Sequence, residues 1–323
     1  MSDATDWGPG AEMATLRWRA QRIARIRAFF AGRGVWEVET PMLSRAGATD
    51  PALHGLESEV SVPVPHRRYW HTSPEFAMKR LLAAGSGAIY QLCRVFRDGE
   101  LGRQHSPEFT LLEWYRPGFD EHDLMDEVAA LLAAVLERPI RSQRIAYRDA
   151  FRRHADLDPI TADPAHCRRC CLDRGLDPVS GATGERDFWL DLLMGHVVGP
   201  ALGHGEPCFV YDYPASQAAL ARVRPGPPPV AARFELYLNG VELANGFHEL
   251  TDPVEQAARF RADLARRRQL GLALPPVDQR LLEAMQAGLP ECAGVAVGVD
   301  RLLMIAAGAD RLEQVLAFPF GRA

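Results

Sequence analysis

Two glutamates flank a predicted β-hairpin in the C-terminal part of the chain. Asn239-Gly240 lies between two runs of alternating residues, and this pair favours the two-residue turn in which both residues take positive φ. Counting back from the turn, Tyr237 faces Glu242, and Glu235 lies on the same face as a diagonal neighbour about 7 to 8 Å away. Two carboxylates so placed repel each other unless a cation lies between them, and Mg²⁺ carrying nucleotide phosphates is the usual occupant. The alternative is a solvated sheet face with two unrelated glutamates.

The strand that follows this turn carries further polar side chains. The run from Glu242 to Glu249 holds Asn245 and Gly246 beside the apolar Leu243 and Phe247. A strand with a purely structural role rarely combines polar side chains and a glycine in so short a stretch. We therefore expect this strand to line a ligand site.

Two arginine-containing segments have the features of phosphate-binding sites. Arg97 lies at the end of a predicted strand, and a charged loop leads from it to Ser106 and Phe109. An arginine at the rim of such a strand-loop-strand unit can grip a phosphate, while Phe109 offers a stacking face. Near the C-terminus, residues 294–300 alternate small and β-branched types, so a ligand can lie against them and be reached by Arg301.

The composition favours a globular enzyme. The 323 residues are 47% hydrophobic, which is enough to bury a substantial core. The net charge of -5 and pI near 6.1 give no general attraction for a polyanion, so tRNA binding is not implied. The absence of a Gly-x-Gly-x-x-Gly fingerprint and of a Walker loop removes the commonest nucleotide-binding folds.

The six cysteines are scattered, and neither a cleavable leader nor a membrane-length apolar run is present. We therefore expect a reduced, cytoplasmic protein without membrane contact. Cys167 and Cys170 have a Cys-x-x-Cys spacing that could begin a zinc site, but no second pair matches it. We interpret these cysteines as structural, with metal binding as the alternative.

The remaining sequence predicts helices and short strands in irregular order. Residues 16–30 form an amphipathic helix with a basic outer face, and a second helix begins at Asp120 and stops at Pro139. Residues 35–43 read as a strand that ends or bends at Pro41. This order favours an α+β fold with a largely antiparallel sheet. The other predicted strands are residues 89–96, 109–115, 208–213, 233–238 and 241–244.

These segments resemble, in the right order, the three motifs of class II aminoacyl-tRNA synthetases. Motif 1 corresponds to residues 34–43, motif 2 to residues 96–109 and motif 3 to residues 294–301. Residues 72–75, 107–115 and 242–250 further resemble the lysyl subgroup of that class. The resemblance extends from about residue 15 to the end and implies a class II catalytic core, an antiparallel β-sheet flanked by helices.

A lysyl-tRNA synthetase carries an anticodon-binding barrel before motif 1, whereas motif 1 begins here almost at the N-terminus. We therefore expect residues 1–14 to form a flexible tail and residues 15–323 the catalytic domain, with no anticodon-binding domain. This shorter form is similar to the bacterial ligases that attach β-lysine to a lysine of translation elongation factor P. The run Trp114-Tyr115-Arg116-Pro117 matches that family, as does Ala296, where lysyl-tRNA synthetases usually have glycine.

The resemblance implies catalytic roles for Arg97 on the α-phosphate and Arg301 on the terminal phosphate of ATP. The ATP-binding set is Arg97, Asp98, Gly99, Glu100, His105, Ser106, Phe109, Glu242, Leu243, Gly298 and Arg301. The substrate-binding set is Ser73, Pro74, Glu75, Tyr115, Asn245, Glu249 and Ala296, in which Glu249 faces the side-chain ammonium. Glu235 and Glu242 are implied to carry Mg²⁺.

Two positions depart from the family's motif 2. An acid usually stands two residues after the arginine, where this chain has Gly99, and Glu100 follows one place later. Either the loop shifts by one residue so that Glu100 is used, or the contact with adenine is lost. Ser106 replaces a usual asparagine but still donates a hydrogen bond.

The leading hypothesis is an ATP-dependent, AMP-forming ligase that activates (R)-β-lysine or lysine and transfers it to elongation factor P. One alternative is a free-standing lysine-activating enzyme that charges tRNA or a small acceptor. The other is a catalytically inactive paralogue that acts as a regulatory subunit. Retention of the candidate site residues argues against this last alternative, for which Gly99 is the only support.

Partners follow from the resemblance and from two basic segments. Motif 1 builds a dimer interface in class II synthetases, so a homodimer is expected, and no tRNA is expected to bind. The basic face of Arg17, Arg22 and Arg25, or the run Arg266-Arg267-Arg268, could dock an acidic partner surface. The alternative for both segments is a solvated helix face.

Overall fold

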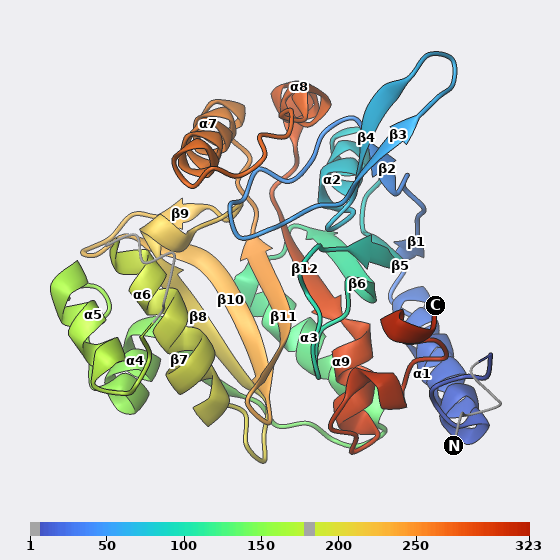
Figure 1. Ribbon diagram of the computed structural model, residues 1–323, viewed down its shortest axis with the longest axis horizontal. Helices are drawn as coiled ribbons and strands as arrows, with labels where there is room; N and C mark the ends of the chain where they lie inside the picture. The colour runs from blue at the N-terminus through green and yellow to red at the C-terminus, as the bar shows by residue number, and fades with distance from the viewer. Residues whose placement is uncertain (1–6, 178–184) are drawn as a thin grey trace.

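The computed structural model describes residues 7–177 and 185–323, and at its centre lies a mixed β-sheet (Figure 1). Within these residues the sheet has nine strands, and its neighbours are antiparallel except for the pairs β1–β5 and β7–β8. The predicted α+β fold with a largely antiparallel sheet is therefore confirmed. The order across the sheet is β1 (Trp36–Glu37), β5 (Ile89–Phe96), β6 (Glu108–Pro117), β12 (Cys292–Gly298), β11 (Val241–His248), β10 (Val230–Leu238), β8 (Cys208–Pro214) and β7 (Gln143–Ala146), and β9 (Val223–Arg224) also pairs with β10.

A smaller sheet holds β2 (Leu43–Ser44), β4 (His66–Trp70) and β3 (Glu57–Val60) in this order, and β3 and β4 form the projecting hairpin in Figure 1. The prediction of one strand over residues 35–43 was wrong in its extent. The chain leaves the large sheet at Glu37 and enters the small one at Leu43. Pro41, which has no N–H to donate to a ladder, lies in this crossing.

The helices cover both faces and one end of the sheet (Figure 1). α1 (Met13–Ala31), α3 (Glu121–Leu136) and α9 (Val299–Ala306) contribute to the largest apolar core, together with the sheet face that carries Trp114 and Val295. α4 (Tyr147–Ala155), α5 (Pro164–Leu172) and α6 (Arg186–Leu193) pack with β8 in a second core. α2 (Glu75–Ala83), α7 (Pro253–Gln269) and α8 (Gln279–Gly288) build a third core, above the sheet in Figure 1.

Helix α3 follows its sequence prediction closely. The Asp120 side chain accepts hydrogen bonds from the backbone N–H groups of His122 and Asp123, and Asp123 completes a capping box. The helix ends at Glu137 in the left-handed conformation, just before the predicted stop at Pro139. The predicted apolar stripe is buried throughout: Leu124, Val128, Leu131, Leu132 and Val135.

The N-terminal segment differs from the predicted flexible tail. The backbone N–H groups of Gly10 and Ala11 donate to the carbonyls of Ala317 and Leu316, and α1 begins at Met13. Gly10 and Ala11 are thus paired with the C-terminal segment, and residues 13 and 14 belong to α1. Residues 1–6 of the expected tail lie outside the described residues.

The two predicted basic faces are partly used within the chain. Arg22 and Arg25 share the single carboxylate of Glu137, so part of the positive charge of the basic face of α1 is paired within the chain. Arg267 is 4% exposed and donates to three backbone carbonyls, which removes it from any docking surface. Arg266 pairs with Glu185.

The cysteine cluster lies in helix α5. Cys167, Cys170 and Cys171 are buried in the core against α6, as the structural interpretation expects. Burial raises the pKa of each thiol, which keeps it protonated. Separately, none of the helices in residues 7–177 and 185–323 is both long and apolar enough to cross a membrane.

Candidate active site

The predicted hairpin joins β10 and β11. Asn239 and Gly240 have φ of 52° and 74°, and Tyr237 pairs with Glu242, as the turn predicts. A register shift between Leu236 and Tyr237 leaves one extra residue in β11, so that Glu235 pairs with Asn245. The predicted diagonal relation of Glu235 to Glu242 is therefore altered by a bulge.

The pairing of five strands arranges the candidate residues in rows. Residues directly opposite each other in a sheet share a face. One row across β10, β11, β12, β6 and β5 consists of Glu235, Asn245, Ala296, Glu113 and Gln91. The next row consists of Arg233, Phe247, Gly294, Tyr115 and Ile89. One sheet face thus collects residues from distant segments of the chain.

Strand β12 forms the low floor of this face. A Cβ atom on Gly294 would come within 2.3 Å of Tyr115 Cε1 and 2.5 Å of Glu249 Oε1, so only glycine allows these side chains to lie over the strand. Ala296 places a methyl group between Asn245 and Glu113 in its row. The small residues of motif 3 therefore make room above the sheet, as the sequence indicates.

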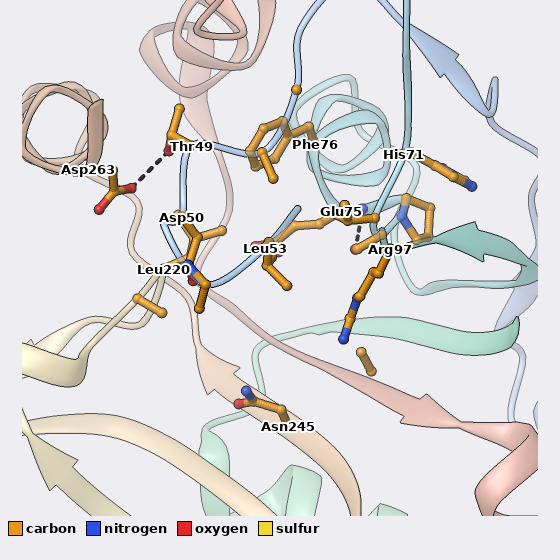
Figure 2. Close-up of a pocket in the computed structure, with 18 of the residues that line it drawn as sticks. Thr49, Asp50, Leu53, His71, Glu75, Phe76, Arg97, Leu220, Asn245 and Asp263 are labelled. Atoms are coloured by element: carbon orange, nitrogen blue, oxygen red, sulfur yellow. Dashed lines mark hydrogen bonds between the residues drawn. The ribbon is translucent and has the colours of Figure 1, made fainter. Parts of the chain in front are cut away.

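A cavity of about 1550 Å³ lies over this face (Figure 2). Figure 2 shows Glu75, Arg97 and Asn245 around it, with residues 49–53 forming a further wall. All seven predicted substrate-binding residues line the cavity: Ser73, Pro74, Glu75, Tyr115, Asn245, Glu249 and Ala296. Nine of the predicted ATP-binding residues also line it: Arg97, Glu100, His105, Ser106, Phe109, Glu242, Leu243, Gly298 and Arg301.

Three predicted site residues, Asp98, Gly99 and Glu235, do not line the cavity. Gly99 has φ of 77°, which makes it a turn residue, and its N–H donates to the Asp98 carboxylate. Glu100 instead lines the cavity and lies 3.6 Å from Arg97 Nη1. The geometry thus favours the shifted loop that uses Glu100. Glu235 is buried, with its two oxygens accepting from Arg233 and Tyr237.

Two arginines, Arg97 and Arg301, line one end of the cavity, together with the Glu100 and Glu242 carboxylates. The Arg97 guanidinium lies 5.1 Å from the centre of the Phe109 ring. Arg301 donates to the backbone carbonyls of Gln104 and Glu242 at 3.0 and 3.2 Å, so it connects the motif 2 loop with β11. Its neighbour Asp300 is 1% exposed and pairs with Arg19 of α1 at 2.5 Å. The surrounding elements therefore hold the arginine end in place.

Negative charge gathers at the other end. Glu113 accepts hydrogen bonds from Ser73 and Tyr115 at 2.6 Å each, and burial together with the Glu75 charge raises its pKa. Burial also raises the pKa of Glu249, despite an ion pair with Lys79 at 2.6 Å. Such a pocket stabilises ammonium groups, because each cation offsets carboxylate repulsion.

Sequence reasoning missed two residues of this acidic end. Glu113 lies two residues before Tyr115, and this period-2 spacing on a strand could have indicated a shared face. Lys79 lies four residues after Glu75 on a helix, which could have indicated their pairing. The second contact of Lys79, with Glu249, joins residues 170 positions apart in the sequence. No local sequence pattern indicates it.

Residues 45–54 form a cavity wall that α7 holds. The Thr49 hydroxyl donates to Asp263 at 2.8 Å (Figure 2). Arg267 donates to the carbonyls of Asp50 and Leu53 at 2.8 and 3.1 Å. The wall therefore depends on a buried arginine rather than on apolar packing alone.

Glu235 and Glu242 form a carboxylate pair that can accept a cation. Burial and the nearby Glu235 charge raise the pKa of Glu242, as expected for two carboxylates that repel each other. Glu242 lines the cavity, whereas Glu235 is shielded behind it by Arg233 and Tyr237. Among the described residues no group of three or more His, Cys, Asp or Glu side chains could hold a metal without other ligands. The pair suits a Mg²⁺ ion whose other ligands are the phosphate oxygens of a nucleotide.

The sequence matches the family of class II tRNA synthetases (D, K and N) over residues 9–322. The chain belongs to this family. Family membership makes the chain an ATP-dependent ligase.

Curated relatives narrow the family further. The chain is 50% identical over 322 residues to the elongation factor P–(R)-β-lysine ligase of Vibrio cholerae, covering 99% of both chains. It is 50% identical to the ligase of the same name from Yersinia enterocolitica, covering 100% of both chains. The ligase of that name from Salmonella paratyphi B is 48% identical, again over 100% of both chains. The chain therefore belongs to the elongation factor P–(R)-β-lysine ligase group of the family.

Proposed function

We propose that this chain uses ATP to activate (R)-β-lysine, or lysine, as an aminoacyl adenylate and transfers it to a lysine of translation elongation factor P. The observation that carries this proposal is a cavity that arginines of motifs 2 and 3 line at one end and a cluster of carboxylates lines at the other. Arg97 and Arg301 line one end, and Glu75, Glu113 and Glu249 line the other. A molecule with ammonium groups at one end and phosphates at the other complements this arrangement. The names of the relatives support the choice of amino acid and acceptor.

In the first step, an oxygen of the substrate carboxylate attacks the α-phosphorus of ATP. A new oxygen–phosphorus bond forms, and the bond to pyrophosphate breaks. Arg97 stabilises the charge that builds on the α-phosphate, and Arg301 holds the terminal phosphate. Phe109 stacks on the adenine, and Glu100 takes the acidic position of motif 2. His105 and Ser106 lie nearby, with Leu243 and Gly298 completing the nucleotide site.

Mg²⁺ would be held by Glu242, with Glu235 beside it, and would neutralise charge on the phosphates of ATP. Glu242 faces the cavity and has a raised pKa through burial and the nearby Glu235, which supports this placement. Glu235 contributes mainly as a fixed negative charge, since Arg233 and Tyr237 already donate to both of its oxygens.

The acidic end orients the amino acid. Glu249 faces the side-chain ammonium, while Glu75, Tyr115 and Asn245 meet the other amino group. Ser73 positions this group of residues, since it donates to Glu113 and accepts from the backbone N–H of Glu75. The Ala296 methyl reshapes the floor, and one methyl changes substrate preference by about 1 to 3 kcal/mol. This bias supports an amino group on the β carbon.

In the second step, a deprotonated lysine amine of the partner attacks the acyl carbon of the adenylate. An amide bond forms, the bond between the acyl carbon and the AMP oxygen breaks, AMP leaves with its electron pair, and one proton of the amine is released to solvent. Translation takes place in the cytoplasm, so we propose a cytoplasmic enzyme with elongation factor P, not tRNA, as acceptor.

A homodimer through the motif 1 segment completes the proposal. Trp36, Met42 and Leu43 of this segment are 54%, 43% and 36% exposed, so the segment offers apolar side chains that a second chain would cover. Sedimentation velocity should give the mass of two chains, and Trp36→Arg with Leu43→Arg should give one. A monomer for the unchanged chain would contradict the dimer.

The activation step is tested by amino-acid-dependent exchange between ATP and pyrophosphate, measured with lysine and with (R)-β-lysine. We expect exchange with at least one of them, and its loss in Glu249→Gln. Exchange with neither amino acid would contradict the enzyme and favour an inactive regulatory paralogue. Exchange followed by transfer to bulk tRNA alone would favour a free-standing lysine-activating enzyme.

A further inference from the structure

Lys79 is the only lysine in the sequence, and the other 36 of its 37 lysine and arginine residues are arginine. Its side chain is 2% exposed beneath the acidic end of the cavity. Arginine serves at every other basic position, including the buried Arg267. Because arginine is used at these other positions, the lysine at position 79 indicates a requirement for a compact ammonium rather than a planar guanidinium.

The Lys79 ammonium gives the two oxygens of Glu249 different surroundings. Lys79 Nζ lies 2.6 Å from Glu249 Oε2 and 2.6 Å from Glu75 Oε1. Glu249 Oε1 instead lies over the cavity floor, 2.5 Å from the place a Cβ of Gly294 would take and beside the Tyr115 ring. Glu75 and Glu249 line the cavity, whereas Lys79 is not among its described lining residues.

We infer that Lys79 is a positioning residue whose ammonium fixes the Glu249 carboxylate in the orientation and ionisation state that the substrate ammonium requires. The inference rests on the proposed function only in that the substrate carries an amine. Lys79 touches neither substrate nor nucleotide, and it acts through Glu249 and Glu75.

The charges around Glu249 explain why a fixed cation is needed. Glu75 on α2 and Glu113 on β6 face it with negative charge, and Tyr115 and Cys292 complete its ionisable surroundings. Burial and the two carboxylates raise the pKa of Glu249, and Lys79 opposes this rise. Beside Lys79 the pKa of Glu249 is about 8, and without Lys79 it would rise further, so the ionised fraction of Glu249 at neutral pH would fall about tenfold for each unit of rise. A neutral acid cannot neutralise the substrate ammonium.

A single lysine makes a direct measurement possible. Labelling the chain with [¹³Cε]lysine gives one NMR signal, which reports the protonation of Lys79 without any need for activity. We expect this signal to stay in its protonated position beyond about pH 10.4, where an ordinary lysine is half titrated. We also expect the signal to move when lysine or (R)-β-lysine is added. A normal titration near that pH, or no response to either amino acid, would overturn the inference.

Two substitutions separate charge from packing. In Lys79→Met, we expect the KM for the amino acid in pyrophosphate exchange to rise about tenfold at pH 7, the effect of one unit in the pKa of Glu249. This KM should fall toward the wild-type value as the pH is raised to 9, because Glu249 ionises, while kcat changes little. Lys79→Arg keeps the positive charge. The KM of this variant should therefore keep the wild-type pH dependence, even if the KM itself is higher.

The control is Arg168→Met, which removes one positive charge from an exposed position on α5 and should leave KM and its pH dependence unchanged. The inference would be overturned if Lys79→Met lost activity equally at all pH values. It would also be overturned if Lys79→Arg showed the same new pH dependence of KM as Lys79→Met. Failure of the proposed function is distinguishable, because the wild-type chain would then lack exchange while the lysine signal still reports on Lys79. That signal and the Lys79→Arg kinetics decide the question even where Lys79→Met does not fold.

Discussion

Among single residues, Arg301 is the side chain whose loss we expect to affect the proposed activation step most. Its hydrogen bonds to the Gln104 and Glu242 carbonyls fix the guanidinium at the arginine end of the cavity. We expect Arg301→Ala to lower kcat for pyrophosphate exchange by about 100-fold or more, the usual effect of removing a preorganised donor. Arg168→Ala, on the exposed surface of α5, is the matched control. Exchange within threefold of wild type in Arg301→Ala would contradict this role.

Gly294 is the second residue with a sharp expectation. An added Cβ would collide with Tyr115 and Glu249, both of which are held by their own hydrogen bonds or ion pairs. We expect Gly294→Ala to lower the free energy of unfolding by about 1 to 3 kcal/mol and to raise the KM for the amino acid. Gly195→Ala is the control, because its added Cβ meets open space. Chemical denaturation that finds no difference between the two variants would refute this account.

Residue types on strands were predictable from the sequence, whereas contacts between distant segments were not. The pocket-facing positions of Tyr115, Asn245 and Ala296 follow from resemblance and from strand alternation. The Lys79–Glu249 ion pair depends on how α2 packs over β11, which no local pattern specifies. Asp98 and Gly99 were assigned to the site by motif position, but the positive φ of Gly99 directs the loop so that Glu100 faces the cavity instead.

At the scale of elements, one buried ion pair joins α1, β6 and α9. Asp300 accepts from Arg19 and from the backbone N–H of Thr110, and it is 1% exposed. We expect Arg19→Ala to lower the free energy of unfolding by about 3 kcal/mol or more, because Asp300 is left buried without its cation. Arg17→Ala, at an exposed position of the same helix, should change it by less than about 0.5 kcal/mol. Equal effects of the two variants in urea denaturation would contradict a stabilising role for the Arg19–Asp300 ion pair.

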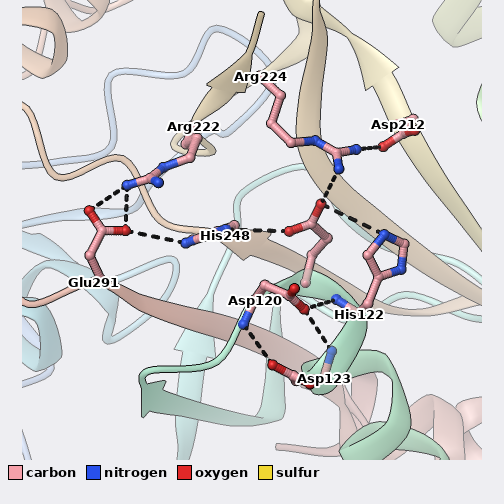
Figure 3. A network of polar contacts seen from close by, with 9 residues as sticks. Asp120, His122, Asp123, Asp212, Arg222, Arg224, His248 and Glu291 are labelled. Atoms are coloured by element: carbon pink, nitrogen blue, oxygen red, sulfur yellow. Dashed lines mark hydrogen bonds and ion pairs between the residues drawn. The ribbon is translucent and has the colours of Figure 1, made fainter.

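A polar network joins the start of α3 to the end of β11 (Figure 3). His248 lies between Glu121 and Glu291, at 3.4 Å from each, and the hydrogen bond with Glu121 raises the pKa of His248. A histidine whose pKa is raised on folding stabilises the protein below its unfolded value of about 6.5. This contribution is lost as the pH rises through the folded value. We expect the wild-type free energy of unfolding to fall between pH 6 and pH 8.

The variant His248→Gln should make this fall shallower, while His166→Gln, at an exposed position of α5, should keep it in full. Part of the fall remains in His248→Gln because the buried Glu113, Glu242 and Glu249 have raised pKa values and also lose stability as the pH rises. Glu121 does not interfere in this window. Burial opposes its ionisation, but His248 and Arg224 outweigh burial and lower the pKa of Glu121, so it stays charged throughout. A pH profile of urea denaturation that is identical in His248→Gln and wild type would rule out the network as its source.

Most elements were predictable because their signals are local. The Asn239-Gly240 turn and the cap of α3 occur where the sequence indicates. The bulge that moves Glu235 opposite Asn245 was not predictable, because the sequence of β10 and β11 carries no local signal for a register shift between Leu236 and Tyr237. The division of residues 35–43 between two sheets likewise depends on where β5 and β4 lie.

At the scale of the whole molecule, the central claim is that a synthetase core acts on a protein lysine. The cavity of about 1550 Å³ has space for more than an amino acid and a nucleotide, which is consistent with an acceptor side chain entering it. The chain itself is an unsuitable acceptor, because its only lysine is 2% exposed. Side-chain acylation should therefore be confined to the partner.

The most direct measurement is intact mass spectrometry of elongation factor P after incubation with the enzyme, ATP and (R)-β-lysine. We expect elongation factor P to gain the mass of one lysyl group, the gain to need ATP, and replacement of the acceptor lysine by arginine to abolish it. Parallel reactions with bulk tRNA should leave the tRNA uncharged. An unmodified elongation factor P in the presence of active pyrophosphate exchange, or aminoacylated tRNA, would contradict the account.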